Sequence, residues 1–470
     1  MGDTDSAFQR ESSPPDWVAE AIFYQIFPDR FCRGKPYPDL PNLASWNDLP
    51  TRENFFGGNL QGILDQLDYL ENEVGVNAIY LNPIFKAETN HKYDTTDYFQ
   101  VDPAFGTNDL FRKLVDEVHR RGMHIILDGV FNHCGMQFPP FQDLIRNGEK
   151  SEYKDWFLAQ SYPIKTDPPN YLTCGGAAYL PKLNHAYRPV QELILKVATY
   201  WIKEFDIDGW RLDVPFKISR DFWHEFRQVV RNANPQAYLV GEIWREAVPW
   251  IKGNIFDGVT NYRLRELLLD YCLTHVLDAE DFAFETDMLL QAHGDASHAM
   301  LNLLGSHDTS RILTLLRGDI NRLKVVLTYL MTVLGAPLIY YGDEVGLLGE
   351  TDPDCRRTMP WDRNQWNLEV VGLYRRLIAL RKEHPCLRQG KRETLFFFNG
   401  VFAYRMSHER DEIIVVLNSR ESVPDLTFLV PGQSSGWKDY ETGGPYTARE
   451  GKINLGRMPS CSALVLEKQY

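Results

Sequence analysis

Short apolar runs alternate with segments of helical periodicity along most of the chain, and this alternation limits the possible fold more than any other feature. The intervening segments include LFRKLVDEVHRRG and LILKVATYWIKEF, in which apolar residues recur every three or four positions. A parallel (β/α)8 barrel requires eight such strand and helix units, so we predict an α/β fold built on a TIM barrel. The eight runs expected as strands are 21–27, 76–81, 124–130, 207–214, 237–244, 256–262, 302–308 and 336–344.

Two parts of the chain depart from this alternation. The connection after the third expected strand is rich in Pro, Gly and aromatic residues and far longer than the usual ~2–6 residues, so we interpret 134–188 as an inserted subdomain. From 388 to 470, β-type runs alternate with turns, which predicts a C-terminal antiparallel β-sandwich domain. Residues 1–16 are polar and are expected to be flexible, which leaves 17–133 and 189–387 for the barrel.

Composition excludes several classes of partner. The 470 residues carry a formal net charge of −14 and no basic cluster, so neither a nucleic acid nor an anionic membrane is expected as a partner. Aromatic residues reach 13%, which suits contact with the rings of a neutral sugar. No run approaches the ~18 apolar residues of a membrane span, and the N-terminus does not resemble a signal peptide. The seven cysteines are scattered singly, which favours reduced thiols in the cytoplasm over disulfides or a zinc site.

Charged residues gather where the expected strands end. In a parallel barrel these ends meet at one face, so side chains from distant parts of the sequence come together there. An Arg and an Asp two positions apart could form a buried pair that only joins two elements. Four charged strand ends together favour a joint functional site instead. They contribute Asp128, Asn132 and His133 from the third, Arg211 and Asp213 from the fourth, Glu242 from the fifth, and His307 and Asp308 from the seventh.

Carboxylates next to an arginine and two histidines suit acid–base chemistry on a neutral substrate, and glycoside hydrolysis requires such carboxyl groups. Arg211 lies two positions from Asp213 and should keep that aspartate ionised, which favours it as the nucleophile. Glu242 lies in the more apolar LVGEIW and is better placed to stay protonated as the acid. Asp308 could bind sugar hydroxyls and oppose positive charge in the transition state.

Five motifs carry a family resemblance. DGVFNH, GWRLDV, GEIW and LLGSHD resemble the four ordered strand-end motifs of the α-amylase family of glycoside hydrolases, and LPKLN in the insertion resembles the fifth. The resemblance implies a retaining mechanism with Asp213 as nucleophile, Glu242 as acid–base and Asp308 as transition-state stabiliser. It also implies that NHKYDTTDYF supplies Tyr93 to stack under the sugar, although a lone tyrosine there would otherwise be an ordinary loop aromatic. DPDCRR resembles the loop whose Asp and Arg close the far side of that sugar.

Within the family, YQIFPDRF, the lysine of LPKLN and GEIWREAVPW are most similar to the neopullulanase, cyclomaltodextrinase and maltogenic amylase group. Members of this group cut α-1,4 and often α-1,6 glucosidic bonds. Trp244 would then stack against a sugar on the leaving-group side, although a tryptophan after a strand more often serves packing. The expected substrate-binding residues are Tyr93, Asp128, His133, Arg211, Trp244, His307, Asp352 and Arg356.

Two departures from that group affect the expected substrate. The first expected strand begins near residue 21, so the group's N-terminal β domain is expected to be missing, which implies a more open site and a different surface for any homodimer. The run Val214-Pro215-Phe216-Lys217 replaces the group's V-A-N-E, which weighs against a preference for cyclodextrins and against transfer activity. We therefore expect an α-glucan hydrolase with debranching ability that acts on maltooligosaccharides, pullulan or branched glucans.

No cofactor and no metal are expected, and two other functions stay open. Asn132 resembles a calcium ligand of α-amylases, but Lys217 stands where those enzymes carry another ligand, and its charge would repel Ca²⁺. A cyclomaltodextrinase, maltogenic amylase or glucan transferase would have the same catalytic residues, and a transferase differs in how well the acceptor side excludes water. An inactive binding protein on the same barrel is disfavoured because all three carboxylates are present.

Overall fold

The computed structural model describes residues 13–35, 40, 43–432 and 434–470, and it confirms the predicted fold class. Residues 1–12 of the expected flexible lead-in lie outside the described residues, and α1 (Asp16–Glu20) starts at its last position. The barrel strands are β1 (Phe23–Ile26), β2 (Ala78–Leu81), β5 (His124–Gly129), β6 (Gly209–Leu212), β7 (Tyr238–Gly241), β8 (Gly258–Val259), β9 (Leu301–Leu303) and β10 (Ala336–Tyr340).

These strands form one parallel sheet in the order β8-β7-β6-β5-β2-β1-β10-β9. The sheet closes on itself because Thr260, just after β8, forms a parallel bridge with Leu301 of β9. A second contact supports the closure, since Asn261 Nδ2 donates a hydrogen bond to Asn302 Oδ1 at 2.8 Å. The closed barrel therefore brings the ends of all eight strands to one face.

Each strand overlaps the run predicted for it, but most of the strands end earlier than the runs do. Asp213, Glu242 and Asp308 consequently belong to the loops that follow β6, β7 and β9 rather than to the strands. The shortest strand, β8, ends early because α9 (Tyr262–Leu269) begins almost at once, with the Asn261 side chain accepting a hydrogen bond from the Leu264 amide.

Helices surround the barrel and bury their apolar faces against it. The helix α4 (Asn108–Arg120) is typical: Thr107 caps its N-terminus by accepting from the Leu110 amide, and Phe111, Leu114 and Val118 lie buried along one face. The remaining helices are α2 (Pro28–Phe31), α3 (Leu60–Asp65), α6 (Arg188–Phe205), α7 (Arg220–Ala233), α8 (Val248–Ile251), α10 (Ala279–His293), α11 (Ile312–Leu315), α12 (Ile320–Thr332), α13 (Leu368–Glu383) and α14 (Cys386–Gln389).

Side chains along the barrel strands alternate between two cores. Phe23, Tyr80 and Leu338 point into the barrel and pack together there. Tyr24, the neighbour of Phe23, belongs to the larger core between the strands and the helices. At position 258 only glycine fits, because a Cβ atom there would lie 1.9 Å from the Ala299 carbonyl oxygen. The close approach of β8 to the backbone just before β9 therefore requires glycine.

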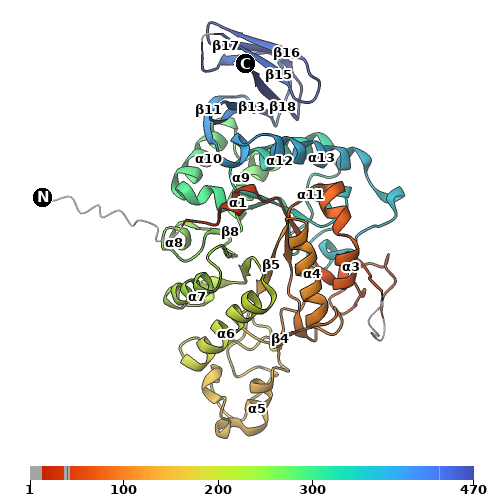
Figure 1. Ribbon diagram of the computed structural model, residues 1–470, viewed down its shortest axis with the longest axis vertical. Coiled ribbons are helices and arrows are strands. Elements are labelled where there is room, and N and C mark those ends of the chain that lie inside the picture. The colour runs from red at the N-terminus through yellow and green to blue at the C-terminus, as the bar shows by residue number, and fades with distance from the viewer. Residues whose placement is uncertain (1–12, 36–39, 41–42, 433) are drawn as a thin grey trace, which may run out of the picture.

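The long connection between β5 and α6 contains the α-helix α5 (Pro139–Asn147) and two short 3-10 helices, η2 (Gly148–Lys150) and η3 (Lys154–Trp156), and is otherwise mostly irregular. Isolated bridges from His133 to Lys182 and from Phe157 to Leu183 hold it together and tie it to the end of β5. In Figure 1 this segment forms one end of the molecule and the C-terminal strands form the other. The sequence did not predict one further element, the antiparallel pair β3 (Phe85–Ala87) and β4 (Thr95–Val101), whose connecting loop carries Tyr93.

The C-terminal strands are antiparallel, as predicted, and form one continuous sheet in the order β11-β12-β13-β18-β15-β16-β17-β14. The two edge strands of this sheet contact each other, and Phe396 stacks on Phe428 at 5.6 Å between ring centroids, so the sheet curls around its own core. The strands are β11 (Lys391–Phe398), β12 (Val401–His408), β13 (Asp411–Asn418), β14 (Val423–Leu429), β15 (Ser434–Asp439), β16 (Pro445–Arg449), β17 (Lys452–Met458) and β18 (Ser462–Gln469).

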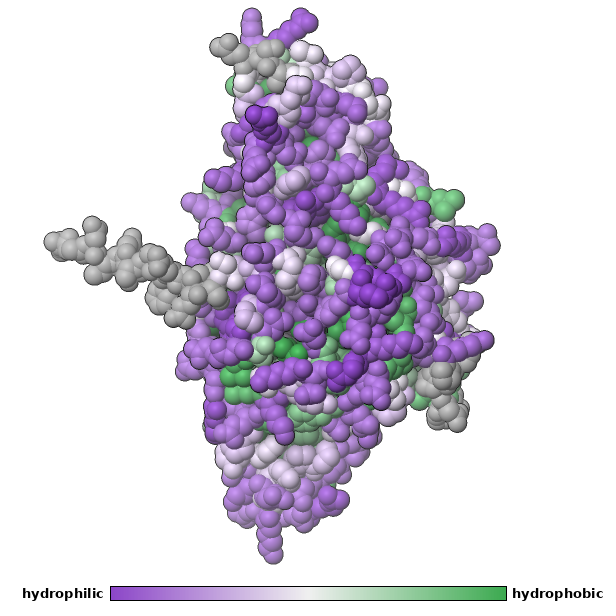
Figure 2. All heavy atoms as spheres, in the orientation of Figure 1, coloured by the Kyte–Doolittle hydropathy of each residue, from purple (hydrophilic) through white to green (hydrophobic). Residues whose placement is uncertain are grey.

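Hydrophilic residues predominate on the face seen in Figure 2, and hydrophobic atoms appear there only in separated groups. Among the residues that the structure describes, no helix combines the length and the apolar composition that a bilayer span requires.

A buried arginine joins α13 to the junction of α12 and β10. Arg381 Nη1 donates to the carbonyl oxygens of Met331 at 2.9 Å and Val333 at 3.0 Å, and Nη2 donates to that of Gly335. Burial and the neighbouring Arg388 charge together lower the pKa of Arg381 to about 9. The guanidinium therefore satisfies carbonyl groups at the end of a helix that have no partner within that helix.

We expect Arg381→Leu to lower the free energy of unfolding by about 3 kcal/mol or more, because buried carbonyls lose their donors. The midpoint of urea unfolding, followed by circular dichroism, measures the effect. Arg410→Ala is the matched control, since Arg410 is exposed. Equal midpoints for both variants would contradict this role of Arg381.

Candidate active site

The predicted residues converge on the face of the barrel where the parallel strands end. A cavity of about 640 Å³ opens there, and seven of the eleven predicted site residues line it. These seven are Tyr93, His133, Asp213, Glu242, Asp308, Asp352 and Arg356. Asp128, Arg211 and His307 lie buried beneath them, and Trp244 lines a neighbouring cavity of about 810 Å³.

Arg211 is the centre of the site. Its side chain is 2% exposed, and Nη1 donates to Asp128 Oδ1 and to Asp213 Oδ1, both at 2.9 Å. Nη2 lies 3.1 Å from Glu242 Oε1. Burial alone would lower the pKa of Arg211, but the charges of Asp128 and Glu242 outweigh it and raise that pKa. One guanidinium therefore holds carboxyl groups from β5 and from the loops after β6 and β7 in a single arrangement.

Several charged groups shift the pKa of Asp213 in opposite directions. Burial raises the pKa of Asp213 well above its ordinary value, the Glu242 charge raises it further, and Arg211 acts against both. The prediction that Arg211 keeps Asp213 ionised considered the Arg211 charge but neither the burial of Asp213 nor the Glu242 charge. Glu242 also accepts from the Val214 amide at 3.0 Å and from Trp244 Nε1 at 3.2 Å. Asp213 therefore holds a proton more strongly than an isolated aspartate does.

A hydrogen-bond chain supports the floor of the cavity. Tyr93 Oη donates to Asp128 Oδ2 at 2.8 Å and lies 2.6 Å from His307 Nε2. The Gln25 amide nitrogen lies 2.8 Å from His307 Nδ1. Burial and the Arg356 charge lower the pKa of His307 well below its ordinary value, so the imidazole is neutral. With Gln25 donating to Nδ1, the proton of His307 lies on Nε2, toward Tyr93.

Asp308 and Asp352 are linked by Arg356. Arg356 Nη2 donates to Asp308 Oδ1 at 3.2 Å, and Nη1 lies 2.9 Å from Asp352 Oδ1. Arg356 Nε donates to the backbone carbonyl of His307 at 2.9 Å, which attaches this loop to the end of β9. The predicted Asp and Arg of DPDCRR therefore close one wall of the cavity, and Asp308, one-third exposed, remains open to a ligand.

His133 presents an unused hydrogen-bonding atom to the cavity. Its Nδ1 lies 3.2 Å from Asn132 Nδ2, whereas its buried Nε2 has no partner among the described residues. Burial lowers the pKa of His133 to about 4, so the ring is neutral near pH 7. A sugar hydroxyl in the cavity would satisfy Nε2.

Trp244 stands between the two cavities. Its ring is 42% exposed and stacks on Tyr262, with centroids 3.8 Å apart and 7° between the ring planes. Through Nε1 it also contacts Glu242 directly. Trp244 therefore offers a flat face next to the carboxyl group expected to protonate a leaving group.

The residues around Asn132 do not suit calcium. The ammonium of Lys182 donates to Asn132 Oδ1 and to the backbone carbonyl of Lys217, the latter at 3.1 Å. Calcium requires six to eight oxygen ligands, and here the Lys182 ammonium already bonds two nearby oxygens, Asn132 Oδ1 and the Lys217 carbonyl oxygen. The part of the chain that the structure describes contains no cluster of His, Cys, Asp and Glu able to hold a metal.

Sequence reasoning missed three supporting residues. Tyr80 donates to Asp128 Oδ2 at 2.7 Å, Gln25 contacts His307, and Tyr262 lies under Trp244 with its hydroxyl 3.1 Å from Ser306 Oγ. The glutamine in the apolar run AIFYQIF was a usable indication, because a buried amide requires a polar partner. Tyr80 and Tyr262 resemble ordinary core residues in sequence.

Comparisons with known proteins agree with the predicted family. Residues 25–368 match the family model described as the alpha amylase catalytic domain. A cyclomaltodextrinase from Thermoanaerobacter pseudethanolicus is 46% identical over 418 residues, which cover 88% of this chain and 72% of that protein.

Two solved structures are similar over nearly the whole chain. The cyclic alpha-maltosyl-(1→6)-maltose hydrolase from Arthrobacter globiformis, in complex with that cyclic sugar, has a TM-score of 0.88 at 38% identity and covers 97% of this chain and 100% of its own. The debranching enzyme from Nostoc punctiforme has a TM-score of 0.86 at 37% identity and covers 97% of this chain and 99% of its own. The chain therefore belongs to the α-amylase family of glycoside hydrolases.

Proposed function

We propose that the protein is a retaining α-glucan hydrolase that cleaves α-1,6 and α-1,4 glucosidic bonds in maltooligosaccharides, pullulan or branched glucans. The observation that carries the proposal is the guanidinium of Arg211, which bonds to Asp213 and contacts Glu242 at the floor of a cavity of sugar size. The neutral histidines and the stacking faces suit an uncharged substrate. Relatives named for hydrolysis of cyclic α-1,6-linked maltose and for debranching support action on α-1,6 bonds.

In the first step, Asp213 attacks the anomeric carbon while Glu242 protonates the departing glycosidic oxygen. The step requires Asp213 as the carboxylate and Glu242 as the acid, and Arg211, which contacts both groups, opposes the effect of burial on the pKa of Asp213. In the second step, Glu242 removes a proton from water, which attacks the glycosyl ester and releases Asp213. When Asp213 becomes esterified, Arg211 keeps Asp128 and Glu242 as anionic partners.

The surrounding residues orient the sugar. Tyr93 stacks under the ring at the cleavage point, and Asp308 opposes the positive charge that develops on it. His133 Nε2 binds a hydroxyl group of the same ring, and His307 supports Tyr93 from beneath the cavity. Asp352 closes the far side with its Arg356 partner. On the other side of the broken bond, Trp244 stacks on the sugar that leaves.

We also propose that the protein is cytoplasmic, because all seven cysteines are free thiols, as a reducing compartment would keep them. In this proposal 17–133 and 189–387 form the catalytic unit, 134–188 covers part of its cavity, and 388–470 forms a separate β domain. Cys174, Tyr179 and Leu180 of 134–188 line the cavity, which supports the covering role of this segment.

We expect Asp213→Asn and Glu242→Gln to lower kcat at least about 10³-fold, because each change removes several kcal/mol of transition-state stabilisation. Release of reducing ends from maltohexaose measures the rate, and thermal unfolding checks that each variant is folded. Glu149→Gln is the control, since Glu149 is exposed and lies away from the cavity. A folded variant with a near-normal rate would refute the assignment.

We expect pullulan to yield maltotriose, the product of cutting its α-1,6 bonds, since Trp244 extends the site beside Glu242 for a leaving sugar of either linkage. Sizing the products by chromatography provides the measurement. Panose without maltotriose would show α-1,4 cleavage only and would contradict debranching. Chains longer than the substrate, formed at high maltooligosaccharide concentration, would instead indicate a transferase.

In this proposal the Lys182 ammonium, rather than a metal ion, positions the loop after the nucleophile. Removal of metal ions should therefore leave catalysis unchanged, whereas removal of the ammonium should slow it. We expect 5 mM EDTA, about a typical chelating dose, to leave kcat/KM of the wild-type protein unchanged, and Lys182→Met to lower it about 10- to 100-fold through misplacement of that loop. Lys150→Met is the exposed control in the same segment. Inactivation by EDTA that calcium reverses would rule out this role.

A further inference from the structure

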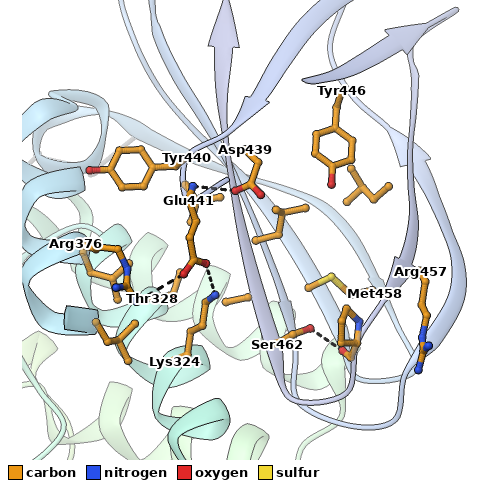
Figure 3. A pocket seen from close by; sticks show the side chains of 17 residues that line it. Lys324, Thr328, Arg376, Asp439, Tyr440, Glu441, Tyr446, Arg457, Met458 and Ser462 are labelled. Atoms are coloured by element: carbon orange, nitrogen blue, oxygen red, sulfur yellow. Dashed lines mark hydrogen bonds and ion pairs between the residues drawn. The ribbon is translucent and has the colours of Figure 1, made fainter. Parts of the chain in front are cut away.

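A further cavity, of about 270 Å³, lies between the C-terminal sheet and the barrel helices α12 and α13 (Figure 3). It shares no residue with the lining of the active-site cavity. Ligand pockets start at roughly 300 Å³, so this cavity has room for about one or two sugar rings. Its floor is apolar and consists of Leu373, Leu377, Leu455, Met458, Leu464 and Val465.

Two polar groups of this cavity have no partner. Within the residues that the structure describes, the Tyr446 hydroxyl forms no hydrogen bond, and the Arg457 guanidinium forms neither a hydrogen bond nor an ion pair. Figure 3 shows the Tyr446 hydroxyl directed toward the other lining side chains, with Arg457 at the edge. Burial and the Asp439 charge raise the pKa of Tyr446, so its hydroxyl remains a proton donor. A ligand could therefore bond both groups without breaking a contact within the protein.

The opposite wall of the cavity is charged but internally paired. Lys324 of α12 donates to one oxygen of Glu441, and Arg376 of α13 lies 3.6 Å from the other. Tyr440 turns its hydroxyl away from the cavity, toward Glu383, at 3.2 Å. This wall offers polar atoms for hydrogen bonding. Because its charges are paired with one another, a neutral ligand that binds there would not remove water from an isolated charge.

These features discriminate between classes of ligand. An anion is disfavoured because it would contact an apolar floor, and Arg457, the cation available to pair with it, lies at the edge of the cavity. The net charge of −14 on the whole chain also disfavours an anion. A fully apolar ligand would bury the Tyr446 hydroxyl without a partner. A neutral ring with apolar C–H faces and hydroxyl edges matches both the floor and the two free donors.

We infer that this cavity is an accessory binding site for a segment of α-glucan chain, and this choice of saccharide rests on the proposed function. In Figure 1 the C-terminal strands lie at the opposite end of the molecule from α5, whose segment flanks the active site. The accessory site therefore does not touch the reacting bond. It retains a long chain on the enzyme and so raises the effective concentration of that chain near the active site.

Retardation in native gels that contain soluble starch tests binding without hydrolysis, in a protein that carries Asp213→Asn. We expect Tyr446→Ala and Arg457→Ala each to weaken the apparent Kd for starch about fivefold or more, since each removes a hydrogen bond to the ligand. Arg457→Ala changes an exposed side chain and leaves the sheet intact. Tyr470→Ala is the matched control, because Tyr470 is exposed, belongs to the same domain and does not line the cavity.

With Asp213 restored, the same variants should raise KM for starch several-fold while kcat and the hydrolysis of maltotriose stay unchanged. Unchanged retardation in both folded variants would overturn the inference, as would an equal loss of maltotriose hydrolysis. Suppression of the Tyr446-dependent retardation by inorganic phosphate would assign the cavity to an anion and also overturn it. If starch retards the protein in a Tyr446-dependent way but the protein hydrolyses no α-glucan, the accessory site is supported and only the proposed function is rejected.

Discussion

The arrangement of the active site depends on the guanidinium of Arg211. Buried carboxyl groups repel one another and favour protonation, so Asp128, Asp213 and Glu242 could not lie together in a stable fold without a compensating charge. Arg211 supplies that charge from the interior of the barrel, through contacts of 2.9 to 3.1 Å. Its charge cannot be lost by titration, so the three acids keep their geometry while their own protonation changes.

This interaction exists only because the barrel is closed. Asp128 and Arg211 come from adjacent strands, paired in register with each other, and Glu242 follows the next strand. His307 and Asp308 follow β9, which reaches the same face after the bridge from Thr260 to Leu301 joins the two ends of the sheet. A reaction that requires charges at several points around one sugar ring is well served by strands that converge from a circle.

Two lysines show how the segments outside the barrel are attached to it. Lys182 carries its ammonium from the long insertion to Asn132 and to the backbone of Lys217, close behind the nucleophile. Lys324 forms an ion pair with Glu441 and so ties the C-terminal sheet to α12. Both contacts lie beside a cavity.

The sequence alone determined three features: the eight apolar runs that become the barrel strands, the order of the strand-end motifs, and the acidic residues within those motifs. Periodicity and the chemistry of short motifs are local properties, which neighbouring residues express in any context. Only the tertiary structure decided that Tyr80, Gln25 and Tyr262 support the site, that burial raises the pKa of Asp213, and that Lys182 donates to Asn132. Those features depend on burial and on contacts between residues far apart in the chain, and both arise only when the barrel closes and its appended segments pack against it.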